Sequence, residues 1–173
     1  QVGAFAATQL QALTNTNLAA LVDTQIAALS TAQASSLTAG QLTAMNATNI
    51  AEFTAAQLAA FTTTQVKALT STNMAALDET QIAAFDATQI ATFSATTISA
   101  LASDQLAALT TTQIGALSAN QVKVFTAGNV GALTETQVDA LNATQMQSLT
   151  ATALSALSET QVASLNTTQV QSL

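Results

Sequence analysis

The chain contains 173 residues, of which 49% are hydrophobic but only 6% are charged and 3% aromatic. It has no His and no Cys, and nine acidic residues stand against two lysines, which gives a net charge of −7. This composition excludes imidazole and thiol catalysis and removes the usual ligands of zinc, copper, haem and iron–sulfur sites. Two cations cannot neutralise a phosphate backbone, so we expect no nucleic-acid partner. Polar residues interrupt every apolar run well short of the ~18 residues of a membrane helix, so we expect no membrane insertion.

An octapeptide repeat runs through the whole chain. Counting from Ala6, 21 units follow one another to Leu173 without insertion or deletion. Residues 62–69 (Thr-Thr-Thr-Gln-Val-Lys-Ala-Leu) give a clear example, and we number the positions of the octapeptide 1 to 8 in that order. The repeat predicts a repeat architecture whose units stack on one another.

Each octapeptide carries a helix-start signal. Position 1 is Ser, Thr, Asp or Asn in 18 of 21 units, the exceptions being Ala6, Val22 and Ala102. Position 4 is Gln in 15 units and Asn in four, the exceptions being Thr97 and Ala153. Ser/Thr-x-x-Gln is a capping box, in which the Gln side chain reaches back to the backbone N–H of the cap residue. The Gln/Asn column could also form a ladder of side-chain amides along the array, which is compatible with capping.

The predicted helices follow one another in chain order, the first after Ala6 and the last after Asn166. One continuous helix is disfavoured, because eight residues advance about 80° beyond two full turns and spread the apolar stripe around it. A strand would place positions 5 and 8 on opposite faces. We therefore predict an all-α solenoid of about 21 very short capped helices. Positions 5 and 8 face the core and positions 2 and 6 face solvent; the sequence leaves open whether two or three octapeptides form one turn.

We expect residues 1–173 to form a single continuous repeat array without a separate globular domain. The first and last residues sit in ordinary repeat positions rather than in atypical capping units. The chain is thus expected to be a window of a longer array, or a subunit whose ends are covered by another copy.

Charged residues offer one candidate cluster for chemistry. Asp78, Glu79 and Asp86 form the densest acidic group and invite a metal or catalytic interpretation. Asp78 and Asp86 occupy the cap position, however, where Asp is a normal substitute for Thr, and Glu79 suits a helix N-terminus. Lys67 and Lys123 lie at solvent positions. We therefore predict no catalytic, cofactor-binding or metal-binding residues and no cofactor.

Position 3 is Thr in 15 of 21 octapeptides, including Thr64, Thr72 and Thr80 in succession. A regular Thr/Ala surface resembles those of ice-binding proteins, so a binding module of that type is the alternative function. Thr at this position can instead serve backbone bonding at the helix start.

The Leu-Thr-x-x-Gln element occurs as Leu-Thr-Ala-Gly-Gln at residues 37–41, Leu-Thr-Thr-Thr-Gln at 109–113 and Leu-Thr-Glu-Thr-Gln at 133–137. It resembles repeat tracts of large secreted or surface proteins of bacteria. The resemblance implies an extracellular or cell-surface location.

The leading hypothesis is a non-catalytic structural protein, either the subunit of a fibre or filament or the rod-like stalk of a surface adhesin. Self-association with copies of the same repeat, end to end or laterally, is the expected partnership. An enzyme is disfavoured, because no base, nucleophile or cofactor signature is present.

Overall fold

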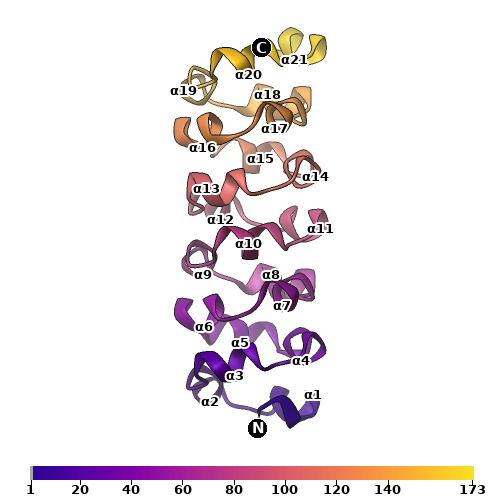
Figure 1. The fold of residues 1–173 in the computed structure, drawn as a ribbon, viewed down its shortest axis with the longest axis vertical. Helices are drawn as coiled ribbons and strands as arrows, with labels where there is room; N and C mark the ends of the chain where they lie inside the picture. Colours follow the sequence, from indigo (N-terminus) through magenta and orange to yellow (C-terminus); the bar gives the residue numbers. More distant parts are fainter. Residues whose placement is uncertain (1) are drawn as a thin grey trace. The chain divides into compact units, whose positions relative to one another are not determined.

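The computed structural model describes residues 2–173. Within them the chain forms one 3₁₀ turn, η1 (Val2–Ala4), and 21 α-helices of four to six residues, with no strand (Figure 1). The helices repeat along the chain, which confirms the predicted all-α solenoid. The chain divides into two compact halves, of which the N-terminal half ends at Phe85 and the C-terminal half spans Asp86–Leu173.

Every helix begins at position 2 of its octapeptide and ends between positions 5 and 7. The helices of the N-terminal half are α1 (Ala7–Gln11), α2 (Asn15–Ala19), α3 (Asp23–Ala27), α4 (Thr31–Ser36), α5 (Ala39–Ala44), α6 (Ala47–Ala51), α7 (Ala55–Ala59), α8 (Thr63–Ala68), α9 (Ser71–Ala75) and α10 (Glu79–Ala83). Those of the C-terminal half are α11 (Ala87–Ile90), α12 (Ala95–Ser99), α13 (Ser103–Ala107), α14 (Thr111–Gly115), α15 (Ala119–Val122), α16 (Ala127–Ala132), α17 (Glu135–Asp139), α18 (Ala143–Ser148), α19 (Ala151–Leu154), α20 (Glu159–Ala163) and α21 (Thr167–Ser172).

The cap residue at position 1 fixes the start of each helix. Its backbone is extended, and its side-chain oxygen accepts a hydrogen bond from the position-4 N–H in every helix except those after Ala6, Val22 and Ala102. At these three exceptions the Gln half of the capping box remains, as in the 2.8 Å bond from the Ala6 N–H to Gln9 Oε1. The predicted helix starts are therefore confirmed.

The helices end without any special residue. No described residue has a positive φ, so the left-handed glycine cap that closes many helices is not used here. The chain instead turns into extended backbone at position 8, as at Leu37 (φ −60°, ψ 141°) and Leu69 (φ −69°, ψ 128°). Extended backbone at position 8 leads directly into the extended cap of the next octapeptide.

Three octapeptides form one turn of the solenoid. In the N-terminal half α1 packs against α4, α2 against α5 and α4 against α7, and in the C-terminal half α13 packs against α16 and α18 against α21. Each helix thus lies over the helix three earlier, so one turn contains 24 residues. This settles, within each half, the choice between two and three octapeptides that the sequence left open.

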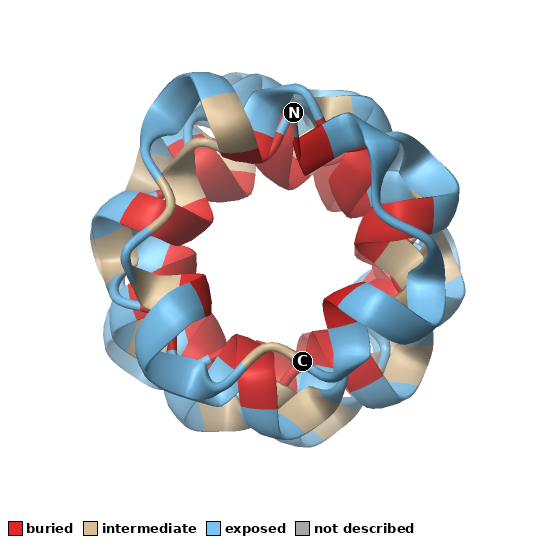
Figure 2. Ribbon diagram, turned by 90° about the horizontal axis from the view of Figure 1, so that it is seen from below, coloured by how far each residue is buried: buried red, intermediate tan, exposed pale blue. Residues whose placement is uncertain are grey.

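Positions 5 and 8 form the core, as predicted. Ile82 and Phe53 are fully buried, and the rings of Phe53 and Phe61 meet edge to face at 5.3 Å. The buried residues lie on the inner sides of the helices in each half (Figure 2). From Gln33 onward position 4 is buried as well, although it carries Gln or Asn in all but two octapeptides. The core of each turn is therefore lined by a polar column that the octapeptide pattern alone does not place inside.

Candidate functional site

The buried amides at position 4 are the most regular polar feature of the molecule. Each is at least nine-tenths shielded from solvent, and amides taken out of water need hydrogen-bond partners to be tolerated. The buried amide residues are Gln33, Gln41, Asn49, Gln57, Gln65, Asn73, Gln81, Gln89, Gln105, Gln113, Gln121, Asn129, Gln137, Gln145, Gln161 and Gln169.

Gln65 shows how such an amide is satisfied. Its Oε1 accepts a hydrogen bond from the Thr62 N–H at 2.8 Å, which completes the capping box of α8. Its Nε2 donates to the backbone oxygens of Ala34 (3.0 Å) and Leu37 (2.8 Å), at the end of α4. A helix end leaves several carbonyls without intrahelical partners. The Leu37 carbonyl receives its donor from Gln65, and the Ala34 carbonyl, which also accepts from the Leu37 N–H, gains a second donor. One amide therefore caps the start of its own helix and the end of the helix four earlier; we call this arrangement the amide bridge.

The same bridge recurs in the C-terminal half. Gln121 donates to the carbonyls of Ile90 and Phe93, both at 2.9 Å. Gln169 donates to those of Val138 (2.8 Å) and Leu141 (2.7 Å). One acceptor lies 28 residues before the Gln and the other lies 31 residues before it or, at Gln81 and Gln137, 30 residues before it, all in the octapeptide four earlier. The described Gln donors thus bond backbone oxygens, not each other, so the column is a set of bridges and not a ladder of amides.

Asn at position 4 makes a poorer bridge, because its side chain is one methylene shorter. Asn73 Oδ1 still accepts from the Thr70 N–H at 2.9 Å, but its Nδ2 reaches only the Met45 carbonyl, at 3.4 Å. Asn49 Nδ2 reaches the Leu21 carbonyl at 3.2 Å, and its buried Oδ1 has no hydrogen-bond partner. The amide bridges at Asn49 and Asn73 are therefore weaker than those at Gln residues.

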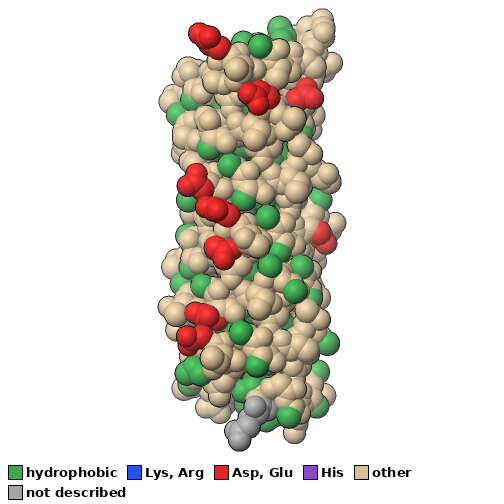
Figure 3. All heavy atoms as spheres, in the orientation of Figure 1, with side chains coloured by type: hydrophobic (Ala, Val, Ile, Leu, Met, Phe, Trp, Pro, Cys, Tyr) green, Lys and Arg blue, Asp and Glu red, His purple; other side chains and the backbone are tan. Residues whose placement is uncertain are grey.

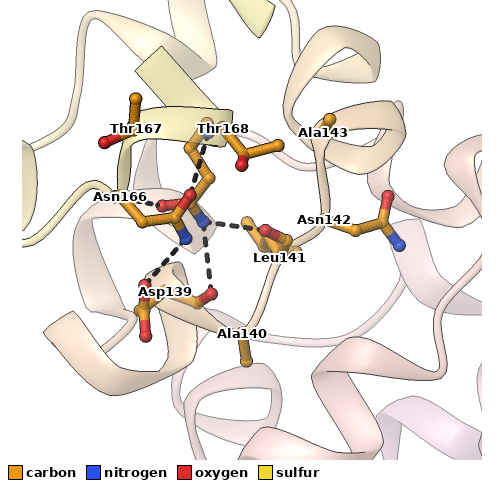
Figure 4. A pocket seen from close by; sticks show the side chains of 9 residues that line it. Asp139, Ala140, Leu141, Asn142, Ala143, Asn166, Thr167 and Thr168 are labelled. Atoms are coloured by element: carbon orange, nitrogen blue, oxygen red, sulfur yellow. Dashed lines mark hydrogen bonds between the residues drawn. The ribbon is translucent and has the colours of Figure 1, made fainter. Parts of the chain in front are cut away.

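An open groove of about 610 Å³ lies between α17, α18 and α21 in the C-terminal half (Figure 4). Asn166 points toward Asp139 there and donates from Nδ2 to Oδ1 at 3.0 Å. Asn142, Thr167 and Thr168 also line it. The groove holds one carboxylate, and residues 2–173 contain no group of three or more Asp, Glu, His or Cys side chains that could hold a metal ion.

In the acidic cluster noted in the sequence, both aspartates accept hydrogen bonds at helix starts. Asp78 Oδ1 accepts from the Gln81 N–H and Asp86 Oδ1 from the Gln89 N–H, both at 2.7 Å. Glu79 is exposed in the first turn of α10. On the face shown in Figure 3 the acids lie singly or in small groups among uncharged side chains. Both Asp residues thus serve as helix caps.

The pKa of Glu135 lies below its usual value. The hydrogen bond from its own backbone N–H lowers the pKa, and the Thr160 hydroxyl lowers it further. Glu135 is exposed, and Thr160 lies in the octapeptide three later, one turn along. Lys67 and Lys123 are both exposed, as predicted.

The position-3 threonines lie on the surface. Thr88, Thr112, Thr136 and Thr160 are all exposed, and their 24-residue spacing places them in one column of the C-terminal half. The hydroxyl of Thr136 lies 3.0 Å from that of the cap residue Thr134, and a Ser158–Thr160 pair repeats this contact. The column is therefore a row of exposed hydroxyls, some of which are already paired with cap hydroxyls.

Comparison with known proteins finds a similarity to one repeat family in the middle of the chain. A family model of the ALTTAQ repeat matches residues 82–119 and again residues 98–135. The two matches begin 16 residues apart, which is two octapeptides, so both follow the same phase. The search of curated proteins found no match. Among residues 2–173, every helix is too short to cross a membrane.

Proposed function

We propose that this repeat protein is a non-catalytic structural element, which forms the body of an extracellular fibre or the rod-like stalk of a surface adhesin. The observation that carries the proposal is the amide bridge. Within each half, successive turns are joined by the same kind of buried Gln–carbonyl bond, illustrated by Gln65 and Gln121. Such an array can lengthen turn by turn without changing its internal contacts.

The polar side chains support a structural role and not a catalytic one. The amides and most cap hydroxyls are engaged with backbone groups, and the acids Asp78 and Asp86 cap helices. Enzyme sites gather nucleophiles, bases and groups of perturbed pKa in one cleft. The groove beside Asp139 offers a single carboxylate and uncharged amides and hydroxyls, which suits no common reaction.

Fibre and stalk differ in what sets the length. In a fibre, copies associate end to end, so length depends on concentration; in a stalk, the number of covalent octapeptides fixes the distance to a distal domain. Electron microscopy of the material from its native source separates them. Long filaments of uniform width support the fibre and short rods ending in globular domains support the stalk. Compact particles without any extended part would contradict both.

Ice binding is the second candidate, and the exposed hydroxyl column of Thr88, Thr112, Thr136 and Thr160 favours it. The test is a thermal-hysteresis assay with observation of crystal shape. Hysteresis that disappears when Thr112 and Thr136 are changed to Lys would support it. An unshaped crystal and no hysteresis gap would remove it.

A further inference from the structure

Three octapeptides carry Asn at the cap position, and each of these asparagines is followed two residues later by Thr. The segments are Asn-Ala-Thr at residues 46–48, Asn-Ala-Thr at 142–144 and Asn-Thr-Thr at 166–168. Asn-x-Ser/Thr, with any residue except Pro at x, is the sequence at which transferases attach a sugar to the Asn side chain. All other asparagines of the chain lack Ser or Thr two residues later. The motif therefore belongs to the Asn caps alone.

The cap geometry fixes how these Asn side chains are oriented. Asn142 has extended backbone (φ −77°, ψ 170°), and its Oδ1 accepts from the Gln145 N–H at 3.0 Å. Asn46 is held in the same way (φ −76°, ψ 169°), with Oδ1 accepting from the Asn49 N–H at 2.9 Å. Because the oxygen faces the helix, Nδ2 is directed away from it, and Asn142 points away from the Asp139–Asn166 pair in Figure 4. Among residues 2–173 the Nδ2 groups of Asn46 and Asn142 have no hydrogen-bond partner.

Both parts of the motif are accessible in the folded chain. Asn46 and Asn142 are exposed, and so are Thr48 and Thr144. The position-4 asparagines differ in both respects, since Asn49, Asn73 and Asn129 are buried and are followed two residues later by Ala or Gly. The chain thus places an Asn amide with a nearby hydroxyl on its surface, where a transferase can reach both.

We propose that Asn46, Asn142 and Asn166 are acceptor sites for N-linked glycosylation. The proposal deepens the structural role proposed above and rests on its extracellular location, because Asn-x-Ser/Thr is glycosylated on the surface of secreted proteins. Position 3 is Thr in most octapeptides, so the repeat builds an acceptor wherever Asn takes the cap. The choice between Asn and Thr at the cap then decides which octapeptides carry a sugar.

The co-reactant is an activated sugar whose anomeric carbon is joined to a diphosphate. The Asn Nδ2 forms a bond to this carbon, the bond from the carbon to the phosphate oxygen breaks with its electron pair, and one Nδ2 proton passes to a base of the transferase. The product is a secondary amide, which keeps its oxygen as an acceptor and one N–H as a donor. The sugar therefore leaves the cap bond from the Gln145 N–H to Asn142 intact. The bond from Asn166 to Asp139 can also persist through the remaining N–H.

Two of the acceptors lie close together in the C-terminal half. Asn142 and Asn166 precede α18 and α21, which pack against each other, so they occupy the same side of this half one turn apart. The open groove of Figure 4 is lined by both residues and by Asp139, Thr167 and Thr168. Amides, hydroxyls and one carboxylate are groups that bond the hydroxyls of a sugar. A sugar on either Asn therefore has room to lie against this surface.

The first test is peptide mapping by mass spectrometry, with electron-transfer fragmentation, of the protein purified from its native source. Peptides that contain Asn46, Asn142 and Asn166 should gain the mass of whole sugar residues, located on the Asn itself. Asn120 is the internal control, because it is exposed but is followed two residues later by Val122, and it should stay unmodified. A single sugar at each site would indicate a nucleotide-linked donor. A preassembled oligosaccharide of constant composition would indicate a lipid-linked donor.

Variants expressed in the native source test the motif separately from the fold. Asn142→Asp removes the nucleophilic nitrogen but keeps the cap, as Asp78 does at the same position, so the sugar at this site should be lost with unchanged circular dichroism. Thr144→Val should lower the occupancy of Asn142 to background, and Thr144→Ser should preserve it. Thr110→Asn creates Asn-Thr-Thr at residues 110–112 on an exposed cap and should gain a sugar.

Several results would overturn the glycosylation proposal. Unmodified Asn at all three positions in the native protein would do so, and so would sugars found only on Ser or Thr hydroxyls. Occupancy of Asn142 that Thr144→Val leaves unchanged would show that the motif does not direct the transfer. Failure of the structural role would be seen separately, as compact particles in the native material, whatever the sugar content of those particles.

Discussion

Gln65 and Asn49 both stand at position 4 in the N-terminal half, and their helices begin with the same cap geometry. Their side-chain amides nevertheless make different hydrogen bonds. Gln65 accepts one backbone N–H and donates to two carbonyls at 3.0 and 2.8 Å. Asn49 donates to one carbonyl at 3.2 Å and leaves its buried Oδ1 without a partner. The backbone offers equivalent carbonyl acceptors to both residues. The one additional methylene of Gln therefore decides whether the amide bridge forms completely.

This comparison shows that the position-4 side chain has two tasks of different reach. Capping is local, because it joins residues three apart, and Asn73 still performs it. Bridging spans a turn and needs the longer arm of Gln. The cross-turn hydrogen bonds of a position-4 Gln should therefore contribute more to stability than its helix cap does.

The largest expected loss of stability comes from replacing a buried core side chain whose carbonyl accepts an amide bridge. Leu109 is buried and its carbonyl accepts from Gln137, so Leu109→Asp places a charge in the core and should cost about 4 kcal/mol or more. Ala107→Lys lies at a half-exposed position 6 and should change the unfolding free energy by less than about 0.5 kcal/mol. Urea denaturation measures both, and equal effects would contradict the assigned core face.

Removing the bridge itself should be the next largest effect. Gln65→Leu leaves the Leu37 carbonyl buried without a donor, removes one of the two donors to the Ala34 carbonyl and takes the side-chain acceptor from the Thr62 N–H. These losses should lower the free energy of unfolding by about 2–4 kcal/mol. Gln65→Asn should reproduce the Asn49 defect and cost about 1–2 kcal/mol. Gln9→Leu is the matched control, because Gln9 is exposed and caps its own helix without a cross-turn bond among residues 2–173. A loss as large as that of Gln65→Leu would mean that capping alone matters.

The comparison can also be sharpened in the opposite direction. Asn49→Gln should give the amide enough reach to cap Asn46 and to bond the carbonyls of Leu18 and Leu21. The expected gain is about 1–2 kcal/mol, seen as a higher urea midpoint with an unchanged m-value. Asn17→Gln makes the same substitution in the first turn and should give almost no gain; a similar gain at both sites would argue against the cross-turn bonds.

The smallest expected effect is the pH response at Glu135. Its pKa is lower in the folded chain than in the unfolded one, so the ionised side chain stabilises the fold above the ordinary glutamate pKa of about 4.3. This contribution should disappear as pH falls through that value and then through the lower folded pKa. Thr160→Val should move the Glu135 pKa, followed by NMR titration, part of the way back up; no movement would exclude the cross-turn contact.

The sequence predicts the local contacts of this structure well and the contacts between turns poorly. Helix starts such as Thr62 and core residues such as Val66 follow from spacings of three or four residues, where geometry is fixed by the helix itself. The bridge from Gln65 to Ala34 depends on how many octapeptides make one turn. The phenylalanines, which could have marked a longer period, follow neither 16 nor 24 residues. Burial of the amides therefore could not be predicted without the number of octapeptides in one turn.

Because no corner needs a residue with positive φ, every octapeptide can occupy any of the three places in a turn. Gain or loss of a single octapeptide should then leave the local fold intact but rotate everything after it by one third of a turn. An exposed row such as Thr88, Thr112 and Thr136 would be broken at that point and would resume on a neighbouring side. The repeat number thus controls which side of the array a surface feature faces, independently of any change in the feature itself.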